Sequence, residues 1–474
     1  MIAVLLAGPL VVADQSSDGE HQTLVRRFTT SDQTTGRYQY LPFDVAEGTG
    51  TLRITYEYDR AGGENVIDLG LFEPGSLELG TPAFRGYSGG SKASILLSPT
   101  ETTPGYRAGR LPAGRWHVLL GLYRVHKDGV DVRVRVQASA GPSATAADRV
   151  RRPSAVPPRS EIRWFAGALH THTIHSDGTL APAELLELSR QAGLDFVAIT
   201  DHNTVTHQQE LASHPPTSQL PLVIAGEEVT TPGGHASVWG LGPNEWVDFR
   251  VRSEDGRISD LVESAHRYGA LFSVNHPVSA CIACGWTHEW VRGIDAIEIS
   301  NGQHGELTGA VAIWDSLLRT GRRITAVGSS DWHRGPNAID DAHVRVQAPV
   351  LTETAILGAI REGRVIVMRK ARDATPEITV TNGSTVAGVG EALAIAPGST
   401  TTVRAIAPGM AGVVMRVIVD GQPAAATSLD SSGKGLIELP GLRGSDSGYV
   451  RVELHSPGHD LALAIANPVY LVKP

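Results

Sequence analysis

Ala183-Glu-Leu-Leu-Glu-Leu-Ser-Arg190, then Gly193, then Phe196-Val-Ala-Ile-Thr200 is the stretch that decides the fold. The first segment places its apolar side chains at helical spacing, and Gly193 ends it. The second segment is a short apolar run with the length of a buried strand. This part of the chain therefore predicts one helix followed directly by one strand.

The same step from helix to strand recurs three more times along the chain. The expected pairs are a helix over 258–268 before a strand over 271–274, a helix over 312–318 before a strand over 324–327, and a helix over 354–361 before a strand over 365–367. Repeated strands and helices of this kind predict a parallel sheet, either open or closed into a barrel.

The segments on either side have a different pattern. Apolar residues alternate with polar ones within 15–140, as in Thr51–Tyr58 and Val130–Val136, and again within 374–474, as in Val450–Leu454. Alternation broken by Gly and Pro turns predicts an antiparallel β-sandwich at each end. Residues 141–160 are rich in Ala, Ser, Pro and Arg and predict a linker, which leaves 161–373 for the α/β unit. We expect the sandwiches chiefly to cover apolar surface of that unit, although they could also form one side of the opening of its barrel.

Composition excludes several classes of protein. The chain has 474 residues and a formal net charge of −9, which argues against a broad surface for nucleic-acid binding. Its two cysteines, Cys281 and Cys284, are too few for a disulfide-stapled scaffold or a four-cysteine zinc module. For this pair we favour a disulfide or two packed thiols over a further metal site with His288.

The first residues suggest export. Met1–Ala13 is apolar but shorter than the roughly 20 residues of a membrane-spanning helix, and no other stretch could cross a bilayer. Val11-Val-Ala13 resembles the small-residue end of a secretory signal, although the preceding basic segment is missing. We therefore predict a signal peptide over 1–14 and a periplasmic or extracellular location, with the cytoplasm as the alternative.

Side chains that commonly bind metals collect at or just after the predicted strands. In His170-Thr-His172, two imidazoles at i and i+2 point to the same side of an extended chain and can share one ion. The remaining candidates follow in the order Asp177, Asp201, His202, Glu228, His235, His276, Asp331 and His333. Groups at the carboxyl ends of successive strands converge on the mouth of an α/β barrel, so the pattern predicts one metal centre.

The ordered motifs H-x-H, S-D-G, T-D-H-N, G-x-E, H, N-H-P and S-D-x-H over about 164–372 resemble those of the PHP (polymerase and histidinol phosphatase) superfamily. Phe84-Arg-Gly-Tyr-Ser-Gly-Gly90, Trp116-His-Val-Leu-Leu-Gly-Leu122 and Gly233-Gly-His-Ala-Ser-Val-Trp-Gly240 resemble the CehA/McbA, or carbaryl-hydrolase-like, branch of that superfamily. This resemblance implies a distorted (β/α)7 barrel with two or three divalent metal ions.

The resemblance also implies a ligand set. The first metal would be held by His170, His172, Glu228 and Asp331, the second by Glu228, His235 and His276, and the third by Asp177, His202 and His333. Glu228 is preferred to Glu227 because the family motif continues with an apolar residue and Ser or Thr. If His235 is not a ligand, two metals or one would remain. Imidazole and carboxylate ligands without thiolate suit zinc, manganese or iron.

Four other residues are candidates for direct roles. His175 and Asp201 could donate a proton or orient a ligand, the alternative for His175 being a structural hydrogen bond. Arg250 and Arg334 could grip an anion, although most arginines are solvated. Gly86-Tyr-Ser-Gly-Gly90 matches the G-x-S-x-G motif of serine hydrolases, but no helix pattern follows it, so we interpret Ser88 as a turn residue.

The predicted activity is hydrolysis by a metal-bound hydroxide. Three divalent ions would outweigh the three carboxylate ligands, which favours a small anionic substrate, most plausibly a phosphoester such as a nucleotide or an oligonucleotide end. The alternative is an aryl carbamate or carboxylic ester cleaved at the same site. A third hypothesis is a non-catalytic binding protein with a vestigial barrel. The sequence predicts no oligomeric state.

Overall fold

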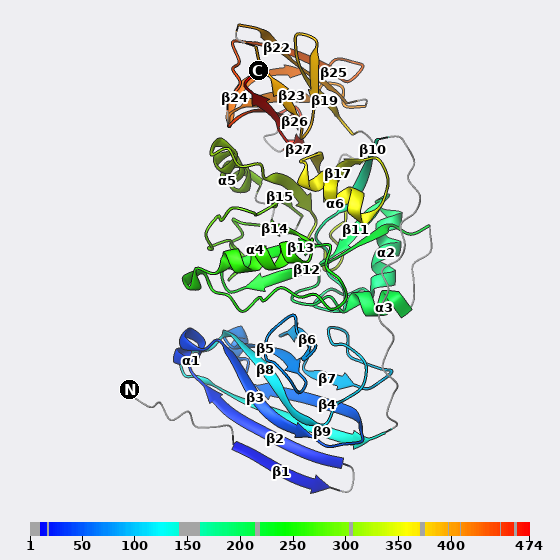
Figure 1. Cartoon of the computed structure of the whole chain (residues 1–474), viewed down its shortest axis with the longest axis vertical. Helices are drawn as coiled ribbons and strands as arrows, with labels where there is room; N and C mark the ends of the chain where they lie inside the picture. Colours follow the sequence, from blue (N-terminus) through cyan, green and yellow to red (C-terminus); the bar gives the residue numbers. More distant parts are fainter. Residues whose placement is uncertain are drawn as a thin grey trace.

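The computed structural model describes residues 10–16, 19–141, 162–213, 219–302, 307–369, 375–396, 398–407, 409–445, 447–458 and 462–474. Three units are stacked along the long axis of the molecule (Figure 1). We call them the amino-terminal unit (19–141), the central unit (162–369) and the carboxy-terminal unit (375–474).

The amino-terminal unit consists of two antiparallel sheets. They have the strand orders β1-β2-β9-β4-β7 and β3-β8-β5-β6. The elements are β1 (Leu10–Ser16), β2 (Gly19–Phe28), α1 (Thr30–Thr35), β3 (Tyr38–Val45), β4 (Thr49–Tyr58), β5 (Val66–Phe72), β6 (Phe84–Gly89), β7 (Ser94–Leu97), β8 (Gly114–Arg124) and β9 (Val130–Ala140). In β9 the side chains of Val130, Val132, Val134 and Val136 are buried in one core with both sheets, while the residues between them are exposed.

The central unit contains the predicted steps from helix to strand. Its elements are β10 (Arg163–Ala168), α2 (Pro182–Gln191), β11 (Phe196–Ile199), α3 (His207–Ser213), β12 (Leu222–Thr231), β13 (Gly234–Trp239), α4 (Ile258–Arg267), β14 (Leu271–Val274), β15 (Ala296–Asn301), α5 (Leu307–Arg319), β16 (Thr325–Ser329), β17 (Ala342–Ala348), α6 (Glu353–Arg361) and β18 (Val365–Arg369). All four predicted helix and strand pairs are therefore confirmed, with ends that differ by a few residues.

The prediction of a parallel sheet is wrong in part, because the central sheet is mixed. Its order is β16-β15-β14-β13-β12-β11-β10-β17-β18, with parallel pairing only within β10-β11-β12 and β14-β15-β16. β13 is antiparallel to both of its neighbours, β12 and β14. Only two residues connect β12 to β13, whereas a parallel crossover would need a dozen or more. β17 is antiparallel to β10 and β18. β16, at the far end of this order, also lies beside β17 and β18, so the sheet curls towards closure.

The carboxy-terminal unit continues the central sheet. β18 pairs with β27, which leads to β26, β23 and β24, while β20-β19-β22-β25 form a separate sheet. The elements are β19 (Glu377–Asn382), β20 (Thr385–Gly388), β21 (Ala392–Ala394), β22 (Thr400–Ile406), β23 (Val414–Val419), β24 (Gln422–Ser428), β25 (Lys434–Pro440), β26 (Gly448–His455), β27 (Ala462–Ala466) and β28 (Val469–Val472). Ile366 and Met368 of β18 belong to the core of this unit, so the two units share a strand.

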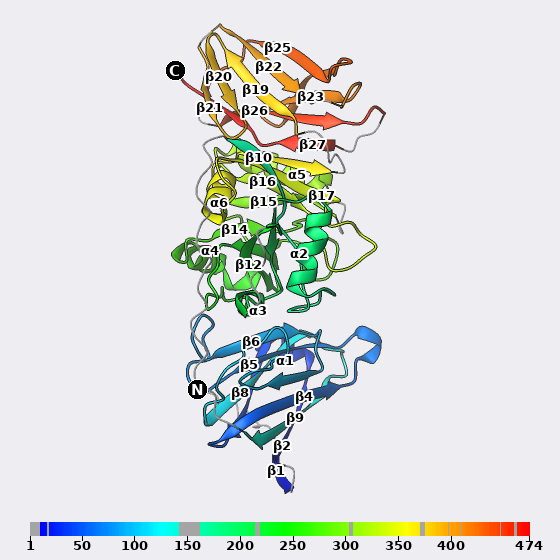
Figure 2. The same cartoon turned by 90° about the vertical axis from the view of Figure 1, so that its right-hand side faces the viewer.

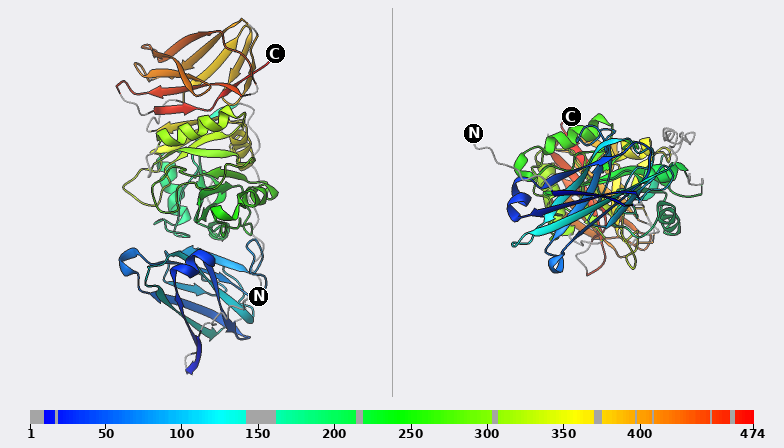
Figure 3. Two further views of the ribbon diagram at one scale, coloured as in Figure 1. Left: turned by 90° about the vertical axis from the view of Figure 1, so that its left-hand side faces the viewer. Right: turned by 90° about the horizontal axis from the view of Figure 1, so that it is seen from below.

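The amino-terminal unit packs with its four-stranded sheet against the central unit (Figures 2 and 3). Phe84 contacts Trp246 at 5.4 Å between ring centroids, and Tyr87 contacts Phe249 at 4.6 Å. The outward face of this sheet is therefore covered by the central unit rather than by water.

Several predictions concern the chain termini and connections. Leu10–Ser16 pairs with β2 as an edge strand and includes the last five residues of the predicted leader, 10–14, whereas residues 1–9 lie outside the described residues. The predicted linker also lies outside them, apart from residue 141. In the described parts of the chain, no helix is both long enough and apolar enough to cross a membrane.

Candidate metal centre

The predicted ligands lie on the ends of the central strands or on the loops that follow. His170 and His172 follow β10, His202 follows β11, and Asp331 follows β16. Glu228 and His235 lie within the β12–β13 hairpin, near its turn. His276 and Asp331 have positive φ values of 25° and 52°, which non-glycine residues adopt only where the surroundings hold them.

Every predicted ligand belongs to at least one group of close donor atoms. Within each group, one nitrogen or carboxylate oxygen per residue lies within 4.8 Å of the others. The groups are His172, Asp177, His202 and His333; His170, Glu228 and His276; His170, His172 and Asp331; and His202, Glu228 and His235. The predicted ligands thus lie in one cluster, but the groups cut across the predicted sets, because His276 groups with His170 and Glu228, whereas His235 groups with His202 and Glu228.

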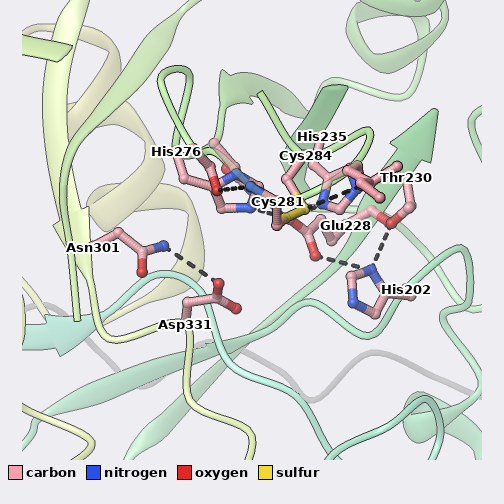
Figure 4. Close-up of a disulfide and its surroundings, with 12 residues drawn as sticks. His202, Glu228, Thr230, His235, His276, Cys281, Cys284, Asn301 and Asp331 are labelled. Atoms are coloured by element: carbon pink, nitrogen blue, oxygen red, sulfur yellow. Dashed lines mark hydrogen bonds and ion pairs between the residues drawn. A yellow bond between two sulfur atoms is a disulfide. The ribbon is translucent and has the colours of Figure 1, made fainter. Parts of the chain in front are cut away.

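Glu228 lies at the centre of the cluster (Figure 4). Its Oε1 is 3.2 Å from Nε2 of His170, 3.3 Å from Nε2 of His276 and 3.3 Å from Nδ1 of His235. Its Oε2 is 2.9 Å from Nδ1 of His202. One carboxylate therefore faces imidazoles on both sides, as a bridging ligand would.

Asp331 and Asp177 organise the other two groups. Oδ1 of Asp331 is 3.2 Å from Nε2 of His170 and 3.1 Å from Nε2 of His172. Oδ1 of Asp177 is 3.3 Å from Nε2 of His333 and 3.7 Å from Nε2 of His202.

The exposed fraction of the side chains differs across the cluster. The side chains of His172 and Glu228 are 0% and 1% exposed, whereas those of His202 and Asp177 are 23% and 40% exposed. Of these four residues, Asp177 and His202 lie on the side of the cluster that is more open to solvent.

The protonation states differ across the cluster. Burial raises the pKa of Glu228, but the charges of His170 and His202 outweigh it and hold the pKa well below its usual range. Burial lowers the pKa of His170 and His202, but the neighbouring carboxylates in turn outweigh it and raise the pKa of both. Burial lowers the pKa of His235 to about 4, which leaves a neutral imidazole, the form that binds metals. Burial, helped by His333 and His202, does the same for His172.

The unsatisfied polar atoms also suit a cation. Both ring nitrogens of His235 and Oε2 of Glu228 are buried without a hydrogen-bond partner among the described residues. Such atoms are costly unless something else binds them. The donor set has nitrogen and oxygen atoms and no thiolate, so these residues fit zinc, manganese or iron.

Glu298 is a functional residue that the sequence reasoning missed. Its Oε1 lies 3.3 Å from Nδ1 of His170, and its Oε2 accepts hydrogen bonds from the backbone of His276 and from Asn301. It thereby orients two of the predicted ligands. The signal was a single carboxylate in the otherwise uncharged strand Ala296–Asn301.

Asn275 was also missed, although it stands in the N-H-P motif. Its amide donates to Oε1 of Glu228 at 2.8 Å and to Ser237 at 3.0 Å. It fixes one oxygen of the central carboxylate.

Asp201 is placed as a positioning residue. Its oxygens accept hydrogen bonds from Thr173 and Ser176, in the loop that carries His172 and Asp177. Burial raises its pKa, but His207 and other imidazoles nearby outweigh this and hold it well below the usual range, so Asp201 stays charged.

His175 is not brought into the cluster. Nδ1 lies 2.8 Å from Thr206 and Nε2 lies 2.9 Å from Glu210. Both ring nitrogens are thus engaged within the protein, which favours the structural alternative.

The two predicted anion-binding arginines differ. Arg250 is paired with Asp248 at 2.9 Å and also donates to Tyr40 and to the backbone of Leu77, at the contact between units, so its guanidinium is engaged within the protein. Arg334 follows His333 and its side chain is exposed, so its contact with an anion stays a prediction.

Glu227 points away from the cluster, as expected. Its Oε1 accepts from the backbone of Val247 at 2.6 Å, and burial raises its pKa to about 8. The interpretation of Ser88 as a turn residue is wrong, because Ser88 lies in β6, one residue before that strand ends at Gly89. Its hydroxyl is 2.8 Å from the hydroxyl of Tyr106, and the next element is the strand β7, so the helix that a serine-hydrolase motif needs does not follow.

Cys281 and Cys284 form a disulfide on the loop after β14, near His276 and His235 (Figure 4). His288, the residue considered for a further metal site, instead lies 2.7 Å from the hydroxyl of Thr231.

Comparisons with known proteins find distant similarities. No family model matches the chain. An uncharacterized protein of Methanocaldococcus jannaschii is 28% identical over 148 residues, which cover 29% of this chain and 81% of that protein.

Among solved structures, a two-domain protein from Bacteroides vulgatus with a predicted PHP-like metal-dependent phosphoesterase is 17% identical, with a TM-score of 0.40, over 69% of this chain and 100% of that one. A proposed metal-dependent phosphoesterase from Bifidobacterium adolescentis is 18% identical, with a TM-score of 0.28; the match covers 37% of this chain and 92% of that one. An amidohydrolase from Chromobacterium violaceum is 15% identical, with a TM-score of 0.28; the match covers 43% of this chain and 98% of that one. At these values, the chemistry of this chain has to be argued from its own residues.

Proposed function

We propose that this chain is a metal-dependent hydrolase of phosphoesters, of the PHP superfamily and its CehA/McbA branch. The observation that carries the proposal is the convergence of His170, His172, Glu228 and Asp331 with the neighbouring donor groups on one buried site. Ordinary folding does not require so many ionisable side chains in contact, because burying charge is costly.

The metals would be held as the sequence predicts. His170, His172, Glu228 and Asp331 would hold the first ion, Glu228, His235 and His276 the second, and Asp177, His202 and His333 the third. Bound divalent ions would supply a water-derived nucleophile near neutral pH and positive charge opposite the developing oxyanion.

The charge around the site favours an anionic ester. Lys92 lies near enough to Asp177 and Asp201 for their charges to act on its pKa, which burial lowers overall. Arg37 lines the open side of the site. Both cations come from the amino-terminal unit and add to the charge that would attract a phosphate group.

The test is hydrolysis of 4-nitrophenyl phosphate by metal-reconstituted protein. Chelation should abolish turnover, and His170→Ala with His172→Ala should lower kcat by more than the roughly 10- to 100-fold typical of outer-shell partners of a metal. His126→Ala is the matched control, because His126 pairs with Glu64 on the surface. Turnover that survives the loss of both imidazoles contradicts the proposal.

An aryl carbamate or carboxylic ester is the second candidate substrate. The observation in its favour is that Tyr38, Tyr87 and Tyr123 line the open side of the site, where an aryl group could pack. 4-Nitrophenyl N-methylcarbamate carries the same leaving group as the phosphate, so the pair isolates the bond that is cleaved. Turnover of the carbamate alone would replace the phosphoester.

A further inference from the structure

A cavity of about 380 Å³ separates the metal centre from the amino-terminal unit. Asp177, His202 and His235 lie on one side of it, and Arg37, Asp68 and Tyr123 lie on the other. The expectation that the amino-terminal unit chiefly covers apolar surface is therefore incomplete, since its outer sheet face also walls the open side of the site.

Strand alternation explains why polar groups stand on this wall. In β5, Ile67, Leu69 and Leu71 belong to the core between the two sheets, so Asp68 points out of the opposite face. In β8, Leu120 and Leu122 belong to the same core, and Tyr123 points outward. The core between the sheets does not require a carboxylate at position 68.

Asp68 and Arg37 have hydrogen-bonding capacity to spare. The hydroxyl of Tyr87 donates to Oδ2 of Asp68 at 2.7 Å, and burial raises the pKa of this carboxyl to about 6. Nε of Arg37 is buried without a hydrogen-bond partner among the described residues. Polar groups of this kind beside a cavity are the usual anchors of a small-molecule site.

Two tyrosines and one glycine shape the cavity. The hydroxyl of Tyr38 donates to the backbone oxygen of Phe249 at 3.5 Å, and that of Tyr123 donates to Ile282. These contacts fix both side chains against the central unit. A Cβ atom at Gly121 would lie 3.1 Å from Oδ2 of Asp68, so a larger residue there would crowd the carboxylate.

We propose that the amino-terminal unit forms the leaving-group subsite of the metal centre, and that it accepts a hydroxylated ring, with Asp68 and Arg37 as the residues that determine specificity. This inference rests on the proposed phosphoester hydrolysis. Ring hydroxyls donate to Asp68 and accept from Arg37, while Tyr38 and Tyr123 pack against the ring.

The chemistry of the wall selects this class. A carboxylate only accepts hydrogen bonds and a guanidinium only donates them, and a hydroxyl can satisfy both. An apolar aryl group would offer no hydrogen bond to Arg37 or to Asp68, which would keep only that from Tyr87, and a site built for hydroxyl groups rejects analogues that lack them. A second anionic group on the leaving alcohol would be repelled by Asp68.

The experiment compares phosphate esters that differ only in ring hydroxyls. The pairs are adenosine 5′-monophosphate with its 2′,3′-dideoxy analogue, and glucose 6-phosphate with (tetrahydropyran-2-yl)methyl phosphate. We expect the hydroxylated member of at least one pair to have a kcat/KM roughly 10- to 100-fold higher, the equivalent of hydrogen bonds to a charged group. Asp68→Asn and Arg37→Gln should each reduce this preference roughly 10-fold, mainly through KM. Equal rates within both pairs overturn the proposal.

Asp44→Asn is the matched control, because Asp44 lies in the same sheet but pairs with Arg115 on the exposed side. It should leave every ratio unchanged. The metal content and the unfolding temperature of Asp68→Asn should match those of the unsubstituted chain, which shows that this variant folds and keeps its metal centre.

A binding measurement separates failure of this inference from failure of the proposed function. We expect calorimetry to detect binding of free adenosine or glucose, and Asp68→Asn to weaken it, whether or not the protein hydrolyses phosphate esters. Binding without any hydrolysis would reject the proposed function and keep the subsite. Hydrolysis of 4-nitrophenyl phosphate with no binding of either compound would reject the subsite alone.

Gly90→Val tests the volume of the cavity. A Cβ atom at Gly90 would make only ordinary contacts, at 3.6 Å to Val66 and 3.8 Å to Asp68. The larger side chain should therefore raise KM for the hydroxylated ring. An unchanged KM would show that the ring does not enter this space.

Discussion

Glu298 links two predicted metal ligands, because one of its oxygens faces the ring of His170 and the other accepts from the backbone of His276. Carboxylates in this position fix the tautomer of a ligating imidazole, and their loss typically costs 10- to 100-fold in metal affinity. We expect Glu298→Gln to lower metal affinity by about this factor, measured by competition with a chelator. Glu187→Gln, which affects only an exposed pair with Arg190, should have no effect. Equal affinities in the two variants would remove Glu298 from the metal centre.

Also at the scale of single residues, the sequence predicted the members of the metal cluster better than it predicted the role of each side chain. The predicted ligands, from His170 to His333, were found because each one stands in an ordered motif at or near a predicted strand. Glu298 stands alone in its strand, and Arg37 and Asp68 lie far from those motifs in sequence. His175 lies next to the motifs, yet its partners come from a segment that the sequence could not place. Side-chain direction and long-range contact decide such cases, and neither is visible in local spacing.

At the scale of elements, the β12–β13 hairpin is the main departure from a repeated strand and helix pattern. Its turn brings His235 opposite Thr230 and so within reach of Glu228. In the sequence, Gly233-Gly-His235 was interpreted only as part of a family motif. A Gly-Gly pair directly between two apolar runs is also a hairpin signal, and it would have predicted the antiparallel strand.

This hairpin yields a test of how an element positions a ligand. Gly234 has a φ of 126°, and a Cβ atom there would lie 2.9 Å from the backbone of Trp286. We expect Gly234→Ala to destabilise the protein by about 1–3 kcal/mol, the cost of a strained backbone, and to weaken metal binding by moving His235. Gly256→Ala is the control, because Gly256 has a φ of 63° with open space around it. Calorimetric unfolding and metal titration measure the two effects, and normal metal affinity in Gly234→Ala would contradict the role of the turn.

At the scale of the whole molecule, the three units are joined in different ways. The amino-terminal unit contacts the central unit through side chains and encloses the cavity, whereas the carboxy-terminal unit continues the central sheet through β18 and β27. The sequence predicted alternation at both ends and so described the two flanks alike. It could not distinguish them, because strand pairing between distant segments leaves no local pattern.

A buried ion pair reinforces the join to the carboxy-terminal unit. The guanidinium of Arg451 in β26 binds both oxygens of Asp315 in α5, at 3.0 and 2.7 Å, and Tyr449 donates to the same carboxylate. The side chain of Arg451 is 2% exposed and also pairs with Glu453, so removing Asp315 leaves the buried charge with one partner instead of two. We expect Asp315→Ala to lower the free energy of unfolding by about 1–3 kcal/mol, the cost of hydrogen bonds lost by a buried charged group, whereas Asp315→Asn, which keeps an acceptor for the guanidinium, should cost less.

Because β18 and β27 are hydrogen-bonded neighbours in one sheet, the loss of stability in Asp315→Ala should extend beyond the carboxy-terminal unit. Asp315→Ala should lower the unfolding temperature of the central and carboxy-terminal units together, observed as one calorimetric transition, while the isolated substitution Asp44→Asn leaves it unchanged. Two transitions, with only one displaced in Asp315→Ala, would show that the units unfold separately and that the shared strand does not couple them. A single displaced transition would instead mean that the metal centre depends on the carboxy-terminal unit for its stability, although that unit contributes none of the proposed ligands.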